Sequence, residues 1–91
     1  MSRGIIKVKY ESDYKPKVFE GKGYSYYTNI DVIIGDYVIA PTVFGDKVAR
    51  VTEINISEDR IESIKPYIKT IKYKVNKTKF LQEHIILEDA A

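Results

Sequence analysis

The residues of this chain best suited to molecular recognition are four tyrosines in its first half: Tyr24, Tyr26, Tyr27 and Tyr37. Exposed aromatic rings stack on nucleic-acid bases, at about 1–3 kcal/mol per base. Lys22 just before the cluster and Arg50 beyond it would contact phosphates. The alternative is structural, since Tyr24 and Tyr26 share one strand face and would pack the core while Tyr27 points to solvent.

A second set of candidate residues consists of lysines near the C-terminal end: Lys65, Lys69, Lys72, Lys74 and Lys77. On a strand, Lys72 and Lys74 would project outward and form a basic stripe whose binding to phosphates depends steeply on salt. Lys7 and Lys9 would extend this stripe if the first and fifth strands were neighbours. The alternative is a solvated face whose lysines prevent edge-to-edge aggregation, which a net charge of only +2 favours.

The third candidate is the segment 11–22, a charged loop that is long for a small domain. Loops carried by a rigid scaffold often mediate recognition, and Tyr14 and Phe19 are aromatic residues of the kind that anchor protein interfaces. The alternative is a connection whose aromatic side chains fold back over the domain. Near the C-terminus, Phe80, Leu81 and Ile85 are further candidates for a protein contact.

Nothing in the sequence indicates catalysis, a metal or a cofactor. The single histidine, His84, has no second imidazole or thiolate with which to share a metal, and the chain has no cysteine. Ser25 has no base near it in the sequence, so nucleophilic catalysis lacks support. We therefore expect a protein that is not an enzyme and that uses no cofactor.

The bulk properties predict one small cytoplasmic domain. A chain of 91 residues buries only about 60% of its unfolded surface, and without cysteine it suits a reducing compartment. No apolar run approaches the ~18 residues of a membrane span, so no membrane partner is expected. Abundant Ile, Lys, Tyr and Asn, whose codons are AT-rich, indicate a low-GC bacterium or its phage.

Five short strands are predicted from alternation and turn residues: 6–10, 23–28, 37–40, 48–56 and 68–75. Gly35 should adopt a positive φ, Pro41 should end the third strand, and a hairpin turn should lie at 44–47. Broken alternation predicts a bulge near Thr52, and residues 57–60 should form a turn or one helical turn. In the fifth strand, Ile71, Tyr73 and Val75 should face inward.

These elements predict a mainly all-β fold, a five-stranded SH3-like barrel over residues 1–75. Residues 76–91, with Phe80, His84 and Leu87 at helical spacing, predict a short C-terminal helix that packs on the barrel. A small split-sheet α+β domain is the competing prediction.

The order of elements resembles the N-terminal 3′-DNA-binding domain of the primosomal replication-restart helicase PriA. The matching segments are 24–26 (Tyr-Ser-Tyr), Gly35 with the strand that ends at Pro41, Gly45, and the Val-rich strand 48–54. In that family an acidic residue beside the aromatic hydrogen-bonds the terminal base of a DNA 3′ end, whereas this chain has Ser25 there. The helicase domains of the family have no counterpart in this sequence.

Two functions are therefore expected. The first is a non-enzymatic module that binds single-stranded or end-containing DNA through Lys22, Tyr24, Tyr26, Tyr27, Arg50, Lys72 and Lys74. The alternative is a phage- or mobile-element-encoded interaction module that inhibits or adapts a host protein, for example a defence nuclease. In that case Tyr14, Phe19, Phe80, Leu81 and Ile85 would form the contact, and the C-terminal helix could also support a homodimer.

Overall fold

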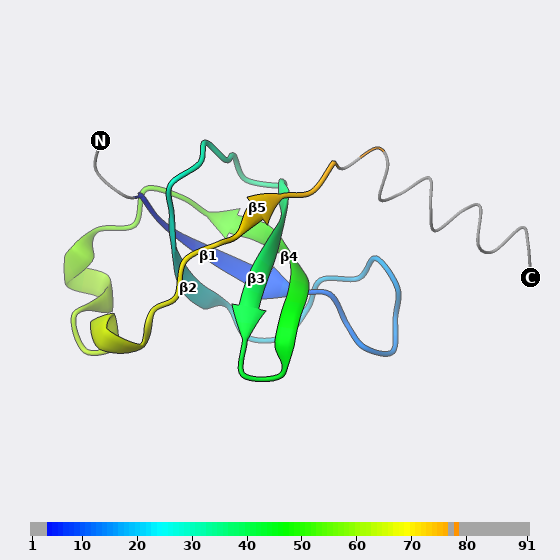
Figure 1. Ribbon diagram of the computed structural model, residues 1–91, viewed down its shortest axis with the longest axis horizontal. Coiled ribbons are helices and arrows are strands. Elements are labelled where there is room, and N and C mark those ends of the chain that lie inside the picture. Colours follow the sequence, from blue (N-terminus) through cyan, green and yellow to red (C-terminus); the bar gives the residue numbers. More distant parts are fainter. Residues whose placement is uncertain (1–3, 77, 79–91) are drawn as a thin grey trace, which may run out of the picture.

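The computed structural model describes residues 4–76 and 78, which form an all-β domain (Figure 1). The strands are β1 (Gly4–Tyr10), β2 (Tyr24–Thr28), β3 (Tyr37–Thr42), β4 (Gly45–Glu53) and β5 (Tyr73–Lys74). Two 3-10 turns, η1 (Glu58–Ile61) and η2 (Lys65–Tyr67), separate β4 from β5, and residues 4–76 contain no α-helix. The predicted all-β class is confirmed. The helix predicted over 76–91 falls almost entirely outside the described residues.

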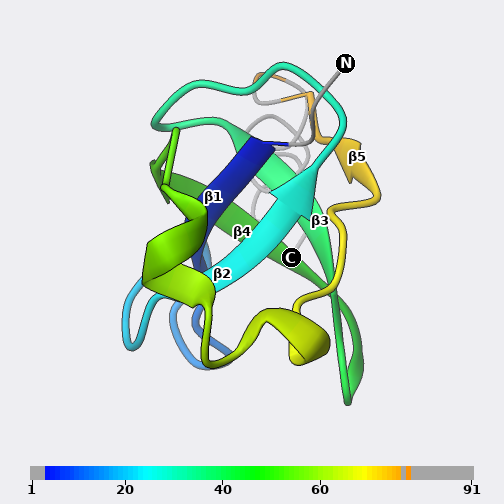
Figure 2. The same ribbon diagram turned by 90° about the vertical axis from the view of Figure 1, so that its left-hand side faces the viewer.

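The five strands form one antiparallel sheet in the order β2-β1-β4-β3-β5, curled into a half-barrel. This architecture is consistent with an SH3-like small barrel. The segment 69–75, which includes β5, runs between β2 and β3 and bonds to both (Figure 2). Tyr27 of β2 donates to the Lys69 carbonyl and accepts from the Ile71 amide, each at 2.9 Å. Lys72 then donates to the Ile39 carbonyl of β3 at 3.0 Å. The chain thus changes partner strand within two residues.

A β-bulge lies at the predicted position. Lys7 pairs with Glu53 and Val8 with Val51, so one step along β1 spans two residues of β4. The extra residue is Thr52, whose hydroxyl donates to the Lys7 carbonyl at 3.2 Å. The bulge bends β4 and increases its twist, which helps so small a sheet to curl.

The glycine turn before β3 agrees with the prediction, whereas the hairpin turn and the end of β3 do not. The hairpin turn lies at Val43 and Phe44 rather than at 44–47, because Gly45 already pairs with Thr42 as the first residue of β4. Gly35 has a φ of 98° in the turn before β3, a region that only glycine adopts at little cost. Strand β3, however, continues through Pro41 to Thr42 and pairs with β4 throughout. Main-chain groups of a strand alternate in direction, so those of Pro41 point the same way as those of Ile39, two residues earlier. The Ile39 carbonyl points away from β4 and accepts from Lys72. The nitrogen of Pro41 therefore also faces away from β4, and no hydrogen bond between β3 and β4 is lost.

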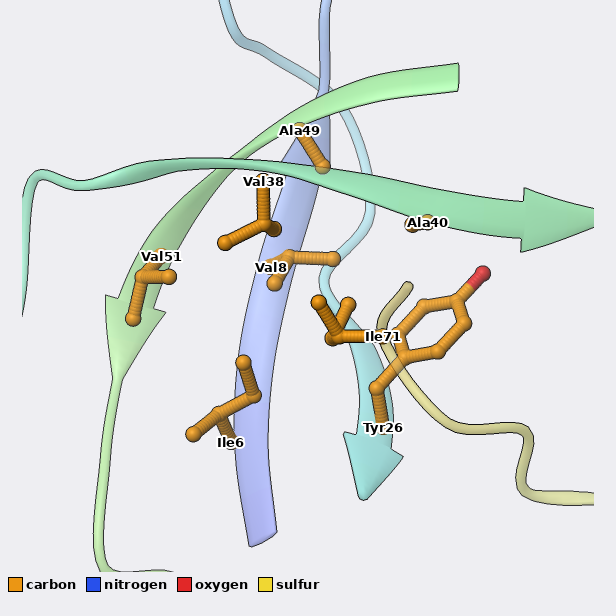
Figure 3. Close-up of a cluster of buried hydrophobic side chains, with 8 residues drawn as sticks. All are labelled: Ile6, Val8, Tyr26, Val38, Ala40, Ala49, Val51 and Ile71. Atoms are coloured by element: carbon orange, nitrogen blue, oxygen red, sulfur yellow. The ribbon is translucent and has the colours of Figure 1, made fainter. Parts of the chain in front are cut away.

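Two apolar clusters hold the fold together. The main one fills the inside of the curled sheet, where Val8, Val38 and Val51 are fully buried and Ile71 packs beside Tyr26 (Figure 3). The second lies on the other side of β1 and β2 and consists of Ile5, Tyr27, Ile56 and Ile61, with Ile68 packed against them. Burial on both faces explains why β1 and β2 carry apolar residues at consecutive positions.

One detailed expectation for the fifth strand was wrong, and one condition attached to the basic stripe is not met. Tyr73 was predicted to face inward, but it is 58% exposed and pairs with Ile39. The prediction assumed one continuous strand, whereas the chain changes from β2 to β3 between Ile71 and Lys72, so the alternation is broken there. The first strand also does not neighbour the fifth, because β1 lies between β2 and β4. Lys7 therefore does not extend a stripe from Lys72.

The second cluster yields a test of the fold. Ile61 is 1% exposed beneath β2, so Ile61→Ala should lower the free energy of unfolding by about 2–5 kcal/mol through lost burial and a cavity. Urea unfolding followed by circular dichroism measures this change. Ile33, at 67% exposure, is the matched control, and Ile33→Ala should change stability by about 0.5 kcal/mol or less. Equal effects of the two substitutions would contradict the packing described.

Candidate functional site

An aromatic groove with a volume of about 340 Å³ lies where the half-barrel is not closed. Its floor is the first half of β2, residues 24–26, with Tyr10 of β1 beside it. One wall is the end of β3 and the hairpin tip, residues 41–44, and the other is the segment 64–69 around η2. Most of these side chains are apolar or aromatic. We call this site the aromatic groove.

At the floor of the aromatic groove, the main chain of Ser25 has no partner among the described residues. In an antiparallel pair, main-chain groups point alternately toward and away from the neighbouring strand. Those of Tyr27 point away from β1 to residues 69–71, so those of Ser25, two residues earlier, point the same way. In the described part of the chain no strand lies opposite Ser25, because segment 64–69 turns away as η2. One N–H donor and one carbonyl acceptor therefore face the groove.

A stacked pair of tyrosines forms one end of the groove. The rings of Tyr10 and Tyr24 lie 4.8 Å apart at 21°. The Tyr10 hydroxyl donates to that of Tyr26, and the Tyr26 hydroxyl donates to the Pro41 carbonyl at 2.8 Å. This chain of hydrogen bonds ties β1, β2 and β3 together across the open part of the barrel. Burial raises the pKa of the Tyr26 hydroxyl, and the hydrogen bond with Tyr10 raises it further.

Lysines stand at the rim of the aromatic groove. The Lys22 ammonium lies 6.0 Å from the ring centre of Tyr24. Lys47 lies 5.8 Å from the ring centre of Tyr10 and pairs with Asp13 at 3.4 Å. Lys69 lines the opposite wall, and within the described residues neither it nor Lys22 forms an ion pair. The rim thus carries two cations whose charge no carboxylate in the described part of the chain neutralises.

The four predicted tyrosines are divided by the structure. Tyr24 is exposed at the groove, and Tyr26 is buried with only its hydroxyl end at the groove wall. Tyr27, which one alternative placed in solvent, is 7% exposed in the second apolar cluster. Tyr37 is buried under Phe19, with ring centres 4.9 Å apart. In this conformation the ring of Tyr24 is accessible for stacking on a ligand, whereas the rings of Tyr27 and Tyr37 are buried.

Of the predicted basic residues, Lys69 lines the groove and Lys22 lies beside Tyr24 at its rim, whereas Lys72, Lys74 and Arg50 lie away from the groove lining. Lys72 is exposed as expected but pairs with Asp46 at 2.8 Å. Lys74 pairs with Asp36 at 3.7 Å and also donates to the Asp31 carbonyl at 3.2 Å. Arg50 is exposed on β4, opposite Tyr37. These residues do not form one basic surface with Lys22.

The long loop 11–23 shows both of the behaviours considered for it. Tyr14 is 93% exposed, whereas Phe19 folds back onto Tyr37 and leaves only part of its ring in solvent. Phe80, Leu81 and Ile85 lie outside the described residues.

Sequence reasoning missed three aromatic residues of the groove. Phe44, at the hairpin tip, and Tyr67, in η2, are 89% and 81% exposed, and Tyr10 ends β1. A large aromatic residue in a tight turn has no core to enter, so the turn positions of Phe44 and Tyr67 were a usable signal. Nothing in the sequence indicated that these three residues lie near Tyr24, because their proximity depends on how the barrel closes.

Other features of the described residues suggest no further chemistry. A second hollow of about 560 Å³ lies at the opposite end of β1, near Ile30 and Asn55, and contains none of the predicted site residues. In residues 4–76 and 78, no three His, Cys, Asp or Glu side chains gather as metal ligands would. The same residues include no helix long and apolar enough to span a membrane.

Comparison with known proteins places the chain in no family: no family model matches it, and neither a curated protein nor a solved structure shows significant similarity.

The buried hydroxyl of Tyr26 predicts a loss of stability in alkali. An unfolded tyrosine ionises near pH 10, and the raised pKa keeps Tyr26 protonated in the folded state above that pH. Above about pH 10 the unfolded chain therefore binds fewer protons, and the free energy of unfolding falls as the pH rises. Urea unfolding between about pH 9 and pH 11 should show a smaller loss for Tyr26→Phe than for the unmodified protein. Parallel losses in the two proteins would refute this role.

Proposed function

We propose that this protein is a non-enzymatic module that binds single-stranded or end-containing DNA in the aromatic groove. The observation that carries the proposal is the main chain of Ser25, which has no partner among the described residues and lies near exposed aromatic rings and near Lys22 and Lys69. A nucleotide needs three kinds of contact: a ring for its base, hydrogen-bonding groups for the base edge, and a cation for its phosphate. The aromatic groove offers all three.

The binding arrangement follows from the walls of the groove. A base can stack on the exposed rings of Phe44, Tyr67 or Tyr24, while its edge meets the N–H, carbonyl and hydroxyl of Ser25. The phosphates then run along the rim past Lys69 and Lys22. A paired base has its edge already occupied, so the groove suits unpaired nucleotides at an end or in a single strand.

The resemblance to the PriA 3′-DNA-binding domain supports this proposal. The segment Tyr-Ser-Tyr at 24–26, which resembles the corresponding segment of that family, lines the groove, and Ser25 stands where the family has its base-reading acid. A serine hydroxyl can donate or accept a hydrogen bond but carries no charge. We therefore infer that this chain relies more on stacking and on the Ser25 main chain than the family does.

Lys72, Lys74 and Arg50, predicted as phosphate contacts, have a lesser role in the proposed complex. The two lysines would have to exchange Asp46 and Asp36 for phosphate, which reduces the net gain. They contribute mainly to the long-range attraction of a polyanion, which salt screens.

Fluorescence anisotropy with a labelled single-stranded oligothymidylate tests the proposal. Affinity should fall as salt rises from about 50 to about 200 mM, because bound phosphates release counterions. Tyr24→Ala should weaken binding about 5- to 150-fold, the equivalent of one lost stacking contact. Lys69→Gln should weaken binding and lower the slope of log K against log salt by about 1.

Lys74→Gln is the matched control for charge, since it removes one lysine away from the groove, and it should change affinity little. Tyr14→Ala is the control for exposed aromatic surface. An oligonucleotide carrying a 3′ phosphate tests whether a free end is preferred. Flat titration curves at low salt, or equal losses for Lys69→Gln and Lys74→Gln, would contradict the proposed function.

A further inference from the structure

The edge of β2 at Ser25 has the properties of a strand-addition site. The segment 69–71 already bonds to this edge at Tyr27, through a single parallel bridge between Tyr27 and Thr70. The same edge continues past Ser25 without a partner in the described part of the chain. Unpaired main-chain groups on an exposed edge are a template for an extended segment from another chain.

The facing edge of the groove cannot take such a strand in the same way. There the outward position of β3 is Pro41, which has no N–H, and its carbonyl already accepts from Tyr26 at 2.8 Å. An incoming strand would therefore pair with β2 alone. It would lie between Tyr24 and the two exposed aromatic walls, where an apolar side chain would be covered by Phe44 and Tyr67.

The charge at the rim decides the composition of the occupant. Lys69 lines the groove wall and Lys22 lies beside Tyr24, and neither has a carboxylate partner within the described residues. Carboxylates at the ends of a bound segment would neutralise these two lysines. The attraction between the opposite charges would also raise the association rate.

We propose that the edge of β2 also binds an extended acidic peptide, one that carries an apolar side chain between acidic residues and belongs to a partner protein. One peptide carbonyl accepts from the Ser25 N–H and one peptide N–H donates to the Ser25 carbonyl, which continues the ladder begun at Tyr27. This interaction goes beyond nucleic-acid binding: it uses the same groove and rim lysines, so peptide and DNA exclude each other.

Two substitutions at one position test the strand addition. Ser25→Ala removes the hydroxyl and keeps the N–H, whereas Ser25→Pro removes the N–H. Because the Ser25 N–H points away from β1, proline there leaves the β1–β2 ladder intact. Phage-displayed random dodecapeptides selected on the full chain supply the probe, and the enriched peptide is then synthesised with and without a fluorophore.

The selected peptides should be acidic with a central apolar residue. Ser25→Ala should bind them as the unmodified protein does, and Ser25→Pro should bind about tenfold more weakly, the equivalent of one main-chain hydrogen bond. Thermal unfolding of Ser25→Pro checks its fold. Independently of that variant, N-methylation of the one peptide amide that donates to Ser25 should weaken binding at least about tenfold, while methylation of its neighbours should change it little.

The variant Phe44→Ala, which lacks one aromatic wall of the groove, gives the background level of the selection. The proposal is overturned if no peptide is enriched above that background, or if N-methylation of each peptide amide in turn changes affinity equally. Peptide binding without oligonucleotide binding would contradict the proposed function and leave strand addition standing. Oligonucleotide binding without peptide binding would contradict strand addition and leave the proposed function standing. Peptide binding that an oligonucleotide does not displace would place the peptide outside the aromatic groove.

Discussion

The structure depends on how one short segment closes the barrel. Residues 69–75 hydrogen-bond first to Tyr27 of β2 and then to Ile39 and Tyr37 of β3, so a few bonds join β2 to β3. They also bring Ile71 into the main core and Ile68 against the second cluster. Without this segment the edges of β2 and β3 would both be open, and a sheet this small would have only marginal stability. Closure is therefore the constraint from which both the core and the surface follow.

The same segment is too short to close the whole gap, and the aromatic groove is what remains. Past Tyr27 the segment that pairs with β2 turns away as η2, so the main chain of Ser25 has no partner in the described part of the chain. Tyr26 spans the opening with its hydroxyl on the Pro41 carbonyl. Aromatic residues that a larger core would cover stay at the surface here. Phe44 and Tyr67 are exposed because the turns that carry them stand on either side of the opening. The site is thus a consequence of incomplete closure.

Local patterns determine much of the fold and little of the site. Alternation and turn residues predict the strands, the glycine turn at Gly35 and the bulge at Thr52, because each depends on residues adjacent in sequence. The orientation of Tyr73 and the burial of Tyr27 depend on which strands become neighbours, which no local pattern encodes. The groove is even harder to predict from the sequence. Its floor includes Tyr24, which composition singled out, but its walls come from a hairpin tip and a 3-10 turn distant in sequence.

The central claim is that recognition takes place at the open edge of β2. The most direct measurement is a two-dimensional ¹H–¹⁵N NMR titration of the labelled full chain with an unlabelled single-stranded oligonucleotide. The account predicts that the amide of Ser25 moves most, together with amides of 41–45 and 64–69, while those of Lys74 and Ile33 stay still. Shifts centred on Lys74 and Arg50, or spread evenly over the basic residues, would contradict it.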